Sequence, residues 1–231
     1  MRLDKYLAEA LNISRSEATT IIKQKKVKID GRIAKSGSEE VKGKVYYNEE
    51  EIVYKEFRYF MINKPKGYVS ASRDDKNPCV VDLVTGVKNL KAAGRLDIDT
   101  TGLMILTNDG AFIHKVTSPK QEIYKTYEVE CDKEFKREFV SAFLEGFDLI
   151  DTDGSIYHTK KAYLEITSKN KALISISEGR FHEIKKMCHE VGLVVTNLKR
   201  IKIGSLELDS ALKEGEAKEL EEKDIEKIFV K

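Results

Sequence analysis

Residues 94–110 read GRLDIDTTGLMILTNDG and join a polar loop to an apolar strand. The loop half is bounded by glycines and carries two carboxylates, Asp97 and Asp99. The strand half, residues 103–107, is a short apolar run closed by the turn sequence Asn-Asp-Gly. A loop anchored by a buried strand can hold a carboxylate rigidly and leave it accessible to a substrate. Taken alone, however, such a carboxylate is more often a cap of its own loop than a catalyst.

Strands and helices alternate around this stretch without a regular period. Besides residues 103–107, strands are expected at 59–62, 123–130, 162–167 and 172–177. Helices are expected at 111–116, 133–145 and 182–191. No regular strand–helix–strand repeat is present, so we predict an α+β fold. No glycine-rich phosphate loop occurs, so the sequence indicates no cofactor.

The first 35 residues predict two short helices followed by a hairpin. Apolar residues recur at helical spacing in residues 3–11. Ser14 to Glu17 then has the pattern of a capping box, which starts a second helix. The alternating residues 27–33 surround an Asp30-Gly31 turn, which is typical of a hairpin.

A domain boundary is expected just before Arg58. Residues 39–56 are acidic and weakly patterned, and the linker falls near 56–58. The run 63–67, with proline and glycine in turn positions, follows the strand that opens the second part. We therefore predict one domain at 1–56 and a second at 58–231.

Charge is unevenly distributed along a chain whose net charge is only +2. Residues 1–35 hold nine Lys/Arg against four Asp/Glu, and residues 180–202 hold six against two. Residues 205–231 are acidic, with five Lys against nine Asp/Glu. Local basic patches on a near-neutral protein favour a polyanionic partner, although a solvated surface gives the same composition. The candidate contacts in the first domain are Arg15, Lys23, Lys25, Lys26, Lys28 and Arg32.

The cysteines argue against a disulfide framework or a thiolate metal site. Cys79, Cys131 and Cys188 are far apart, and no Cys-x-x-Cys pair occurs. Free thiols fit a reducing cytoplasm. No apolar run reaches the length of a signal peptide or a membrane span, so we expect a soluble cytoplasmic protein with no membrane contact.

Four stretches in order resemble the pseudouridine synthases that modify ribosomal RNA. The loop sequence GRLDIDTTGLMILTNDG resembles their signature loop, and residues 58–68 resemble the strand that opens their catalytic domain. Residues 125–127 resemble their Lys-x-Tyr segment, and residues 177–187 (SEGRFHEIKKM) resemble their final motif. The N-terminal segment resembles an S4 RNA-binding domain. The resemblance covers essentially the whole chain and implies a mixed, mostly antiparallel catalytic sheet behind a small S4 domain.

The resemblance also implies roles for individual residues. Asp97 matches the nucleophile, Tyr127 the active-site tyrosine and Lys185 the basic residue that pairs with the nucleophile. Arg95 matches the residue that enters the RNA stack where the target base has left. Arg180 and His182, in the final motif, are further candidates for RNA contact. Read from the residues alone, Tyr127 could be a core aromatic, Arg95 a structural ion-pair partner and Lys185 an exposed helix lysine.

Two features of the final motif need an explanation. Relatives commonly have Gln after the histidine, whereas this chain has Glu183, and an acid there opposes RNA phosphate unless it points away or pairs with a lysine. The set His182, Cys188 and His189 resembles metal ligands, but adjacent helix residues point in different directions and no fourth ligand has sensible spacing. We therefore predict no metal.

The substrate implied by the small-subunit group is one uridine in 16S ribosomal RNA, modified by a monomeric enzyme. The start MRLDK, the Asp-Thr-Thr sequence after Asp97 and the acidic C-terminal residues resemble that group. Two alternatives stay open: a pseudouridine synthase for large-subunit (23S) RNA, and a non-catalytic S4-domain RNA-binding or assembly factor. The intact set Asp97, Tyr127 and Lys185 favours an enzyme.

Overall fold

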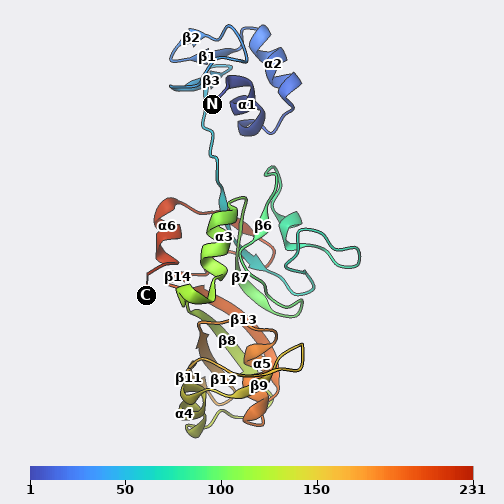
Figure 1. The fold of residues 1–231 in the computed structure, drawn as a ribbon, viewed down its shortest axis with the longest axis vertical. Coiled ribbons are helices and arrows are strands. Elements are labelled where there is room, and N and C mark those ends of the chain that lie inside the picture. Colours follow the sequence, from blue (N-terminus) through green and yellow to red (C-terminus); the bar gives the residue numbers. More distant parts are fainter. Residues whose placement is uncertain (231) are drawn as a thin grey trace. The chain divides into compact units, whose positions relative to one another are not determined.

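A computed structural model of the chain describes residues 1–230 and divides them into two compact units. The first unit spans Met1–Phe57 and the second begins at Arg58 (Figure 1). Each unit has a hydrophobic core of its own. None of the helices in the described part is long and apolar enough to cross a membrane.

The N-terminal unit packs two helices against a small antiparallel sheet. Its strands lie in the order β2-β1-β3-β4. The core is formed by side chains such as Leu3 and Leu7 from the first helix, Ile22 from the second and Val27 from the sheet. The elements are α1 (Leu3–Ala10), α2 (Arg15–Lys23), β1 (Val27–Ile29), β2 (Arg32–Ile33), β3 (Val45–Tyr47) and β4 (Glu50–Ile52).

The local signals in this unit are confirmed. The Ser14 side chain accepts the amide of Glu17, and the Glu17 side chain accepts the amide of Ser14, so the capping box starts α2. Asp30 and Gly31 have positive φ of 48° and 78°, as the tight turn between β1 and β2 requires. Strands β3 and β4 were not predicted, because a strand of three residues is too short to show an alternating pattern, and two of the three residues of β4 are glutamates. They form because β1 pairs with β3, whose other edge pairs with β4.

The second unit is built on one large mixed sheet. Nine of its described strands belong to this sheet, whose main order is β11-β12-β8-β13-β7-β5-β15. Among the described strand pairs of this sheet only β13–β7 is parallel, which confirms the predicted mostly antiparallel arrangement. The strands are β5 (Tyr59–Lys64), β6 (Lys91–Ala92), β7 (Thr101–Thr107), β8 (Lys125–Cys131), β9 (Asp148–Ile150), β10 (Ile156–His158), β11 (Tyr163–Ser168), β12 (Lys171–Ile176), β13 (Val195–Ile203), β14 (Leu206–Glu207) and β15 (Ala217–Glu219).

Alternate residues of the central strands enter two different cores. In β7, Leu103 and Ile105 pack with α3 and α6, whereas Met104 and Leu106 pack with α4 and α5. We call the second side the α5 face, and it carries the candidate site. The helical segments are η1 (Val80–Leu83), α3 (Gly110–Thr117), η2 (Pro119–Gln121), α4 (Glu138–Glu145), α5 (Glu183–Glu190) and α6 (Glu222–Lys227).

Each strand and helix expected in this unit is found near its predicted position, with one shortened helix. The expected helix at 133–145 begins only at Glu138. The long central strand β13 was not predicted, because its sequence VTNLKRIKI places basic and polar residues among the apolar ones. The hairpin of β9 and β10 and the strand β15 were also not predicted, and all three are only three residues long.

Candidate active site

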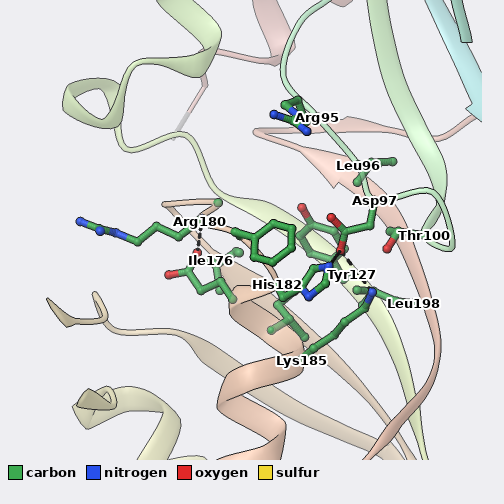
Figure 2. A pocket seen from close by; sticks show the side chains of 14 residues that line it. Arg95, Leu96, Asp97, Thr100, Tyr127, Ile176, Arg180, His182, Lys185 and Leu198 are labelled. Atoms are coloured by element: carbon green, nitrogen blue, oxygen red, sulfur yellow. Dashed lines mark hydrogen bonds and ion pairs between the residues drawn. The ribbon is translucent and has the colours of Figure 1, made fainter. Parts of the chain in front are cut away.

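A pocket of about 180 Å³ opens on the α5 face and collects the six catalytic and RNA-contact candidates that the sequence places in the second unit. Its walls come from the loop before β7, from β8, β12 and β13, and from the loop that enters α5. Figure 2 shows Asp97, His182 and Lys185 pointing toward one another within it. The lining residues are Arg95, Leu96, Asp97, Thr100, Tyr127, Ile176, Gly179, Arg180, Phe181, His182, Glu183, Ile184, Lys185 and Leu198.

The loop that carries Asp97 is anchored on both sides. Before it, Leu96 is buried, and its amide and carbonyl both bond to the Ser70 hydroxyl at 2.9 and 2.7 Å. After it, the Thr100 carbonyl accepts a 2.8 Å hydrogen bond from the ammonium of the fully buried Lys64. Burial lowers the pKa of Lys64 to about 8, although the charges of Asp99 and Asp97 oppose the shift. The loop is therefore held from the sheet, while the Asp97 side chain stays 29% exposed.

The Asp97 carboxylate contacts side chains rather than its own loop. Its Oδ2 lies 3.2 Å from the Lys185 Nζ and 3.4 Å from the His182 Nε2. Within residues 1–230 it accepts no backbone hydrogen bond, and its Oδ1 has no hydrogen-bond partner. This geometry disfavours the loop-cap interpretation, because a cap would accept a nearby amide.

Lys185 contacts Asp99 more closely than Asp97. Its Nζ lies 2.8 and 3.0 Å from the two Asp99 oxygens. Burial opposes the charge of Lys185, but its hydrogen bonds to Asp99 and Asp97 outweigh burial and raise its pKa. Burial likewise opposes the charge of Asp99, but Lys185 outweighs it and holds the pKa of Asp99 below its ordinary value.

Aromatic and imidazole rings complete the pocket. Tyr127, on β8, is 7% exposed and lines the pocket as part of the core. His182 has a left-handed backbone with φ 56°, directly before α5. Its ring stacks on Phe181 at a centroid distance of 3.8 Å. Phe181 is 51% exposed, so it presents an aromatic surface at the pocket.

Glu183 points into the protein and not toward the open pocket mouth. It is 4% exposed, and its Oε2 accepts the Arg180 amide at 3.0 Å. Burial raises the pKa of Glu183 to about 7, although that hydrogen bond opposes the shift. The acid that replaces the common Gln therefore closes the turn that carries His182.

The two arginines at this pocket differ in their surroundings. Arg95 is exposed and makes no ion pair with any residue in 1–230, which disfavours a structural ion-pair role. Arg180 bonds to Asp151 at 2.7 Å and lies over the Tyr157 ring at 4.1 Å. Figure 2 shows its side chain extending away from Asp97.

The other basic candidates belong to the N-terminal unit. Lys28 pairs with Glu49 and Arg32 with Glu39, both at 2.7 Å. Four others are exposed and form no ion pair with residues 1–230: Arg15, Lys23, Lys25 and Lys26.

The described part of the chain contains no cluster of side chains suited to binding a metal ion. No group of three or more His, Cys, Asp or Glu residues there is placed to hold an ion. Cys188 is fully buried and hydrogen-bonds Cys131, which together with burial raises its pKa.

Two residues at this site were not singled out in the sequence as functional candidates. Lys64 was quoted only as part of a turn, and Phe181 only as part of a motif. An aromatic residue between an arginine and a histidine is a usable signal for Phe181, since single-stranded RNA is bound by stacking. A lone lysine carries no comparable signal of burial.

Comparisons with known proteins agree with this architecture. The family RNA pseudouridylate synthase matches residues 58–190, and the S4 domain matches residues 1–48. The chain is 41% identical to the Ribosomal small subunit pseudouridine synthase A of Haemophilus influenzae, covering 99% of both chains. It is 37% identical to the protein of that name from Escherichia coli, covering 97% of this chain and 98% of the relative.

A solved structure gives the same result. A chain described as a pseudouridylate synthase superimposes with a TM-score of 0.70 and 40% sequence identity, covering 99% of both chains. The family match includes the signature loop, the strands from β5 to β12 and the whole of α5. The chain therefore belongs to the RNA pseudouridylate synthase family, with an S4 domain ahead of the catalytic unit.

Proposed function

We propose that this enzyme isomerises one uridine of small-subunit ribosomal RNA to pseudouridine, with Asp97 as the nucleophile. The observation that carries the proposal is the Asp97 carboxylate itself. It is held by an anchored loop and paired on one oxygen with Lys185 and His182, while residues 1–230 offer no hydrogen-bond partner to the other oxygen. A carboxylate in this setting is positioned for covalent catalysis.

The chemistry follows from the bonds that must change. As the N1–C1′ bond breaks, the electron pair leaves with uracil, and positive character at C1′ is captured by the Asp97 carboxylate. The freed uracil turns, its C5 bonds to C1′ and the carboxylate leaves. The C5 proton is then removed and N1 gains a proton, so the product has the same composition as uridine and no cofactor is consumed.

Tyr127 and Lys185, which line the same pocket as Asp97, assist this sequence. The ring of Tyr127 stacks on uracil and retains it while it turns, and its hydroxyl helps to remove the C5 proton. The Lys185 ammonium stays beside Asp97, where a positive charge favours the ionised carboxylate.

A uridine inside RNA structure reaches Asp97 only after it leaves the stack. Arg95 is exposed beside the pocket and free of ion pairs in the described chain, so its planar guanidinium is available to fill the vacated space. Arg180 and His182 contact the RNA around the flipped nucleotide. The basic residues of the N-terminal unit bind phosphates without reading bases.

The small subunit is proposed as the source of the RNA because relatives 36–41% identical over nearly the whole chain carry that name. The test is a map of pseudouridines in ribosomal RNA from cells with and without this gene. One small-subunit uridine should lose its modification in the deletion strain and regain it when the gene is returned. A lost site in large-subunit RNA instead would contradict the choice of substrate and leave the chemistry standing.

A further inference from the structure

A second pocket, of about 350 Å³, lies next to the first and is not used by the chemistry above. The two pockets share Arg95, Tyr127, Gly179 and Arg180 as wall residues. The volume falls in the range of small-molecule sites, roughly 300–1,000 Å³.

The first polar group of this second pocket is the Arg200 guanidinium, which makes fewer hydrogen bonds than it can donate. Arg200, on β13, is 4% exposed, and its Nε donates to the Leu103 carbonyl at 2.7 Å. Its Nη2 is buried without a hydrogen-bond partner in the described residues. The guanidinium carbon lies 6.0 Å from the centre of the Tyr127 ring, which joins it to the catalytic pocket. Leaving a buried donor unsatisfied is costly, so a ligand acceptor at this point is favoured.

Lys125 adds a second donor. Among the described residues its Nζ makes only long contacts, at 3.4 Å to the Ser177 carbonyl and 3.5 Å to the Glu178 carbonyl. Burial lowers the pKa of Lys125 to about 8, and the neighbouring charge of Arg200 acts in the same direction. The ammonium is therefore held in the pocket wall with hydrogen bonds to spare.

The third polar group is an acceptor. The Glu178 Oε2 is buried without a hydrogen bond, and the nearest cationic nitrogen, Arg180 Nε, is 3.8 Å away. The remaining walls include the apolar side chains of Val116, Pro119 and Ile203. An occupant that satisfies the site is flat and apolar in body, with acceptors facing the two cations and donors facing the carboxylate.

Guanine has that pattern. Its O6 and N7 are adjacent acceptors that suit Arg and Lys, and its N1–H and N2 amino groups are donors that suit a carboxylate. Adenine places a donor amino group where the two cations require an acceptor. A bare phosphate would meet the Glu178 carboxylate and leave the apolar walls unused.

We propose that this second pocket binds a guanine base that neighbours the target uridine, with Arg200 and Lys125 on its O6/N7 edge and Glu178 on its N1/N2 edge. That this guanine belongs to an RNA chain rests on the proposed function. Recognition of an unstacked base beside the reacting one selects the uridine by its sequence context.

The first experiment measures binding of three nucleotides to the full chain by isothermal titration. Guanosine monophosphate should bind at least about fivefold more tightly than adenosine monophosphate, with inosine monophosphate, which lacks the N2 amino group, in between. Glu178→Gln should remove the difference between the guanosine and inosine nucleotides. Arg200→Met and Lys125→Met should weaken the binding of guanosine monophosphate and of inosine monophosphate by the same factor, because both nucleotides keep O6 and N7.

Lys199→Met is the matched control, since Lys199 precedes Arg200 on β13 and faces the other side of the sheet. It should leave all three affinities unchanged. Thermal melts check that each variant folds. If Arg200→Met does not fold, Lys125→Met and Glu178→Gln are enough to test the proposal.

The second experiment replaces each guanosine that flanks the mapped uridine with inosine in an RNA transcript. For one position the KM of the wild-type enzyme should rise at least about fivefold, and Glu178→Gln should be insensitive to the change. If guanosine and adenosine monophosphates bind to the wild type equally well, the pocket assignment is wrong, whether or not the enzyme makes pseudouridine. A guanine preference without any KM effect assigns the pocket to a free nucleotide and overturns the RNA part. An enzyme that makes no pseudouridine overturns the proposed function and leaves the nucleotide titration to decide the pocket.

Discussion

Lys185 is shared between two carboxylates, and the sharing distinguishes them. Asp99 takes the two short contacts and is 51% exposed on its side chain. Asp97 takes one longer contact, is less exposed and has an oxygen without a hydrogen bond in the described chain. Asp99 therefore holds the ammonium more closely, whereas Asp97 keeps one oxygen open toward the pocket, as the proposed nucleophile requires.

Replacing Asp97 with Asn tests the proposed nucleophile directly. The amide keeps size and shape but cannot attack C1′, so turnover should fall at least about a thousandfold. RNA affinity should be preserved, because it comes mainly from phosphate contacts. The measurements are tritium release from C5-labelled uridine in ribosomal RNA and a parallel binding assay.

Asp99→Asn is the control in the same loop. Asp97 and its contact with Lys185 remain, so activity should stay within about tenfold of the parent. An Asp97→Asn enzyme that binds RNA normally and still works at about a tenth of the parental rate would show that the mechanism is wrong.

Glu183→Gln tests the buried acid through the pH dependence of stability. Glu183 in the unfolded chain ionises near 4.5, but burial raises its folded pKa to about 7. Between these values the folded protein holds a proton that the unfolded chain has released, so stability falls as the pH rises. The Gln variant should escape this loss and gain about 2 to 3 kcal/mol over the parent above pH 7. Urea unfolding of both proteins at pH 4.5, 6 and 8 measures the difference in their free energies of unfolding. A difference that stays constant across this series would refute the buried-acid account.

At the scale of elements, the join between β7 and β13 has the fewest paired residues along the main strand order of the sheet. Only two residue pairs connect these strands, Lys199 with Thr101 and Arg200 with Gly102. Gly102 has φ 101°, and a Cβ there would overlap the backbone of Arg200. The glycine of the signature loop is therefore required by the close approach of β13, which also brings Arg200 to the second pocket.

Gly102→Ala should destabilise the catalytic unit by about 2 to 4 kcal/mol, because it combines a strained φ with backbone overlap. Gly110→Ala is the matched control: no atom lies within 4 Å of its added Cβ, and it begins α3. Alanine favours helix, so that variant should be neutral or slightly more stable. Equal unfolding midpoints for both variants in urea would mean that the strand join tolerates a side chain.

At the scale of the whole molecule, the cores of the two units are separate. The N-terminal core uses residues from Leu3 to Val45, and the catalytic cores use residues from Phe60 onward. Each unit therefore buries apolar side chains of its own, and we expect the second unit to fold without the first.

Removal of residues 1–57 should leave the catalytic unit folded and weaken RNA binding. Loss of the four unpaired cations Arg15, Lys23, Lys25 and Lys26 should reduce the slope of log K against log salt by about 3. Circular dichroism and a salt series measure the two effects. Changing the same four residues to Gln in the full chain should reproduce most of the slope loss, and an unchanged slope in both proteins would contradict phosphate binding by this unit.

Sequence alone determined the features that depend on neighbours along the chain. The capping box of α2, the Asp30-Gly31 turn and the apolar strand after Asp97 were predicted because their signals are local. The family resemblance supplied the domain order and the candidate residues, and the structure brings Asp97, Tyr127 and Lys185 to one pocket.

Tertiary structure alone decided what those residues contact. That Lys185 bonds Asp99 more closely than Asp97, that Lys64 is buried beneath the loop, and that Arg200 and Glu178 meet in one cavity all depend on pairings between distant segments. Strand β13 is the clearest case. Its Lys and Arg residues interrupt the alternating apolar pattern that predicts a strand, and it forms because β8 and β7 pair with its two edges. Burial and hydrogen bonding in a sheet are set by partners far along the chain, and local pattern does not encode them.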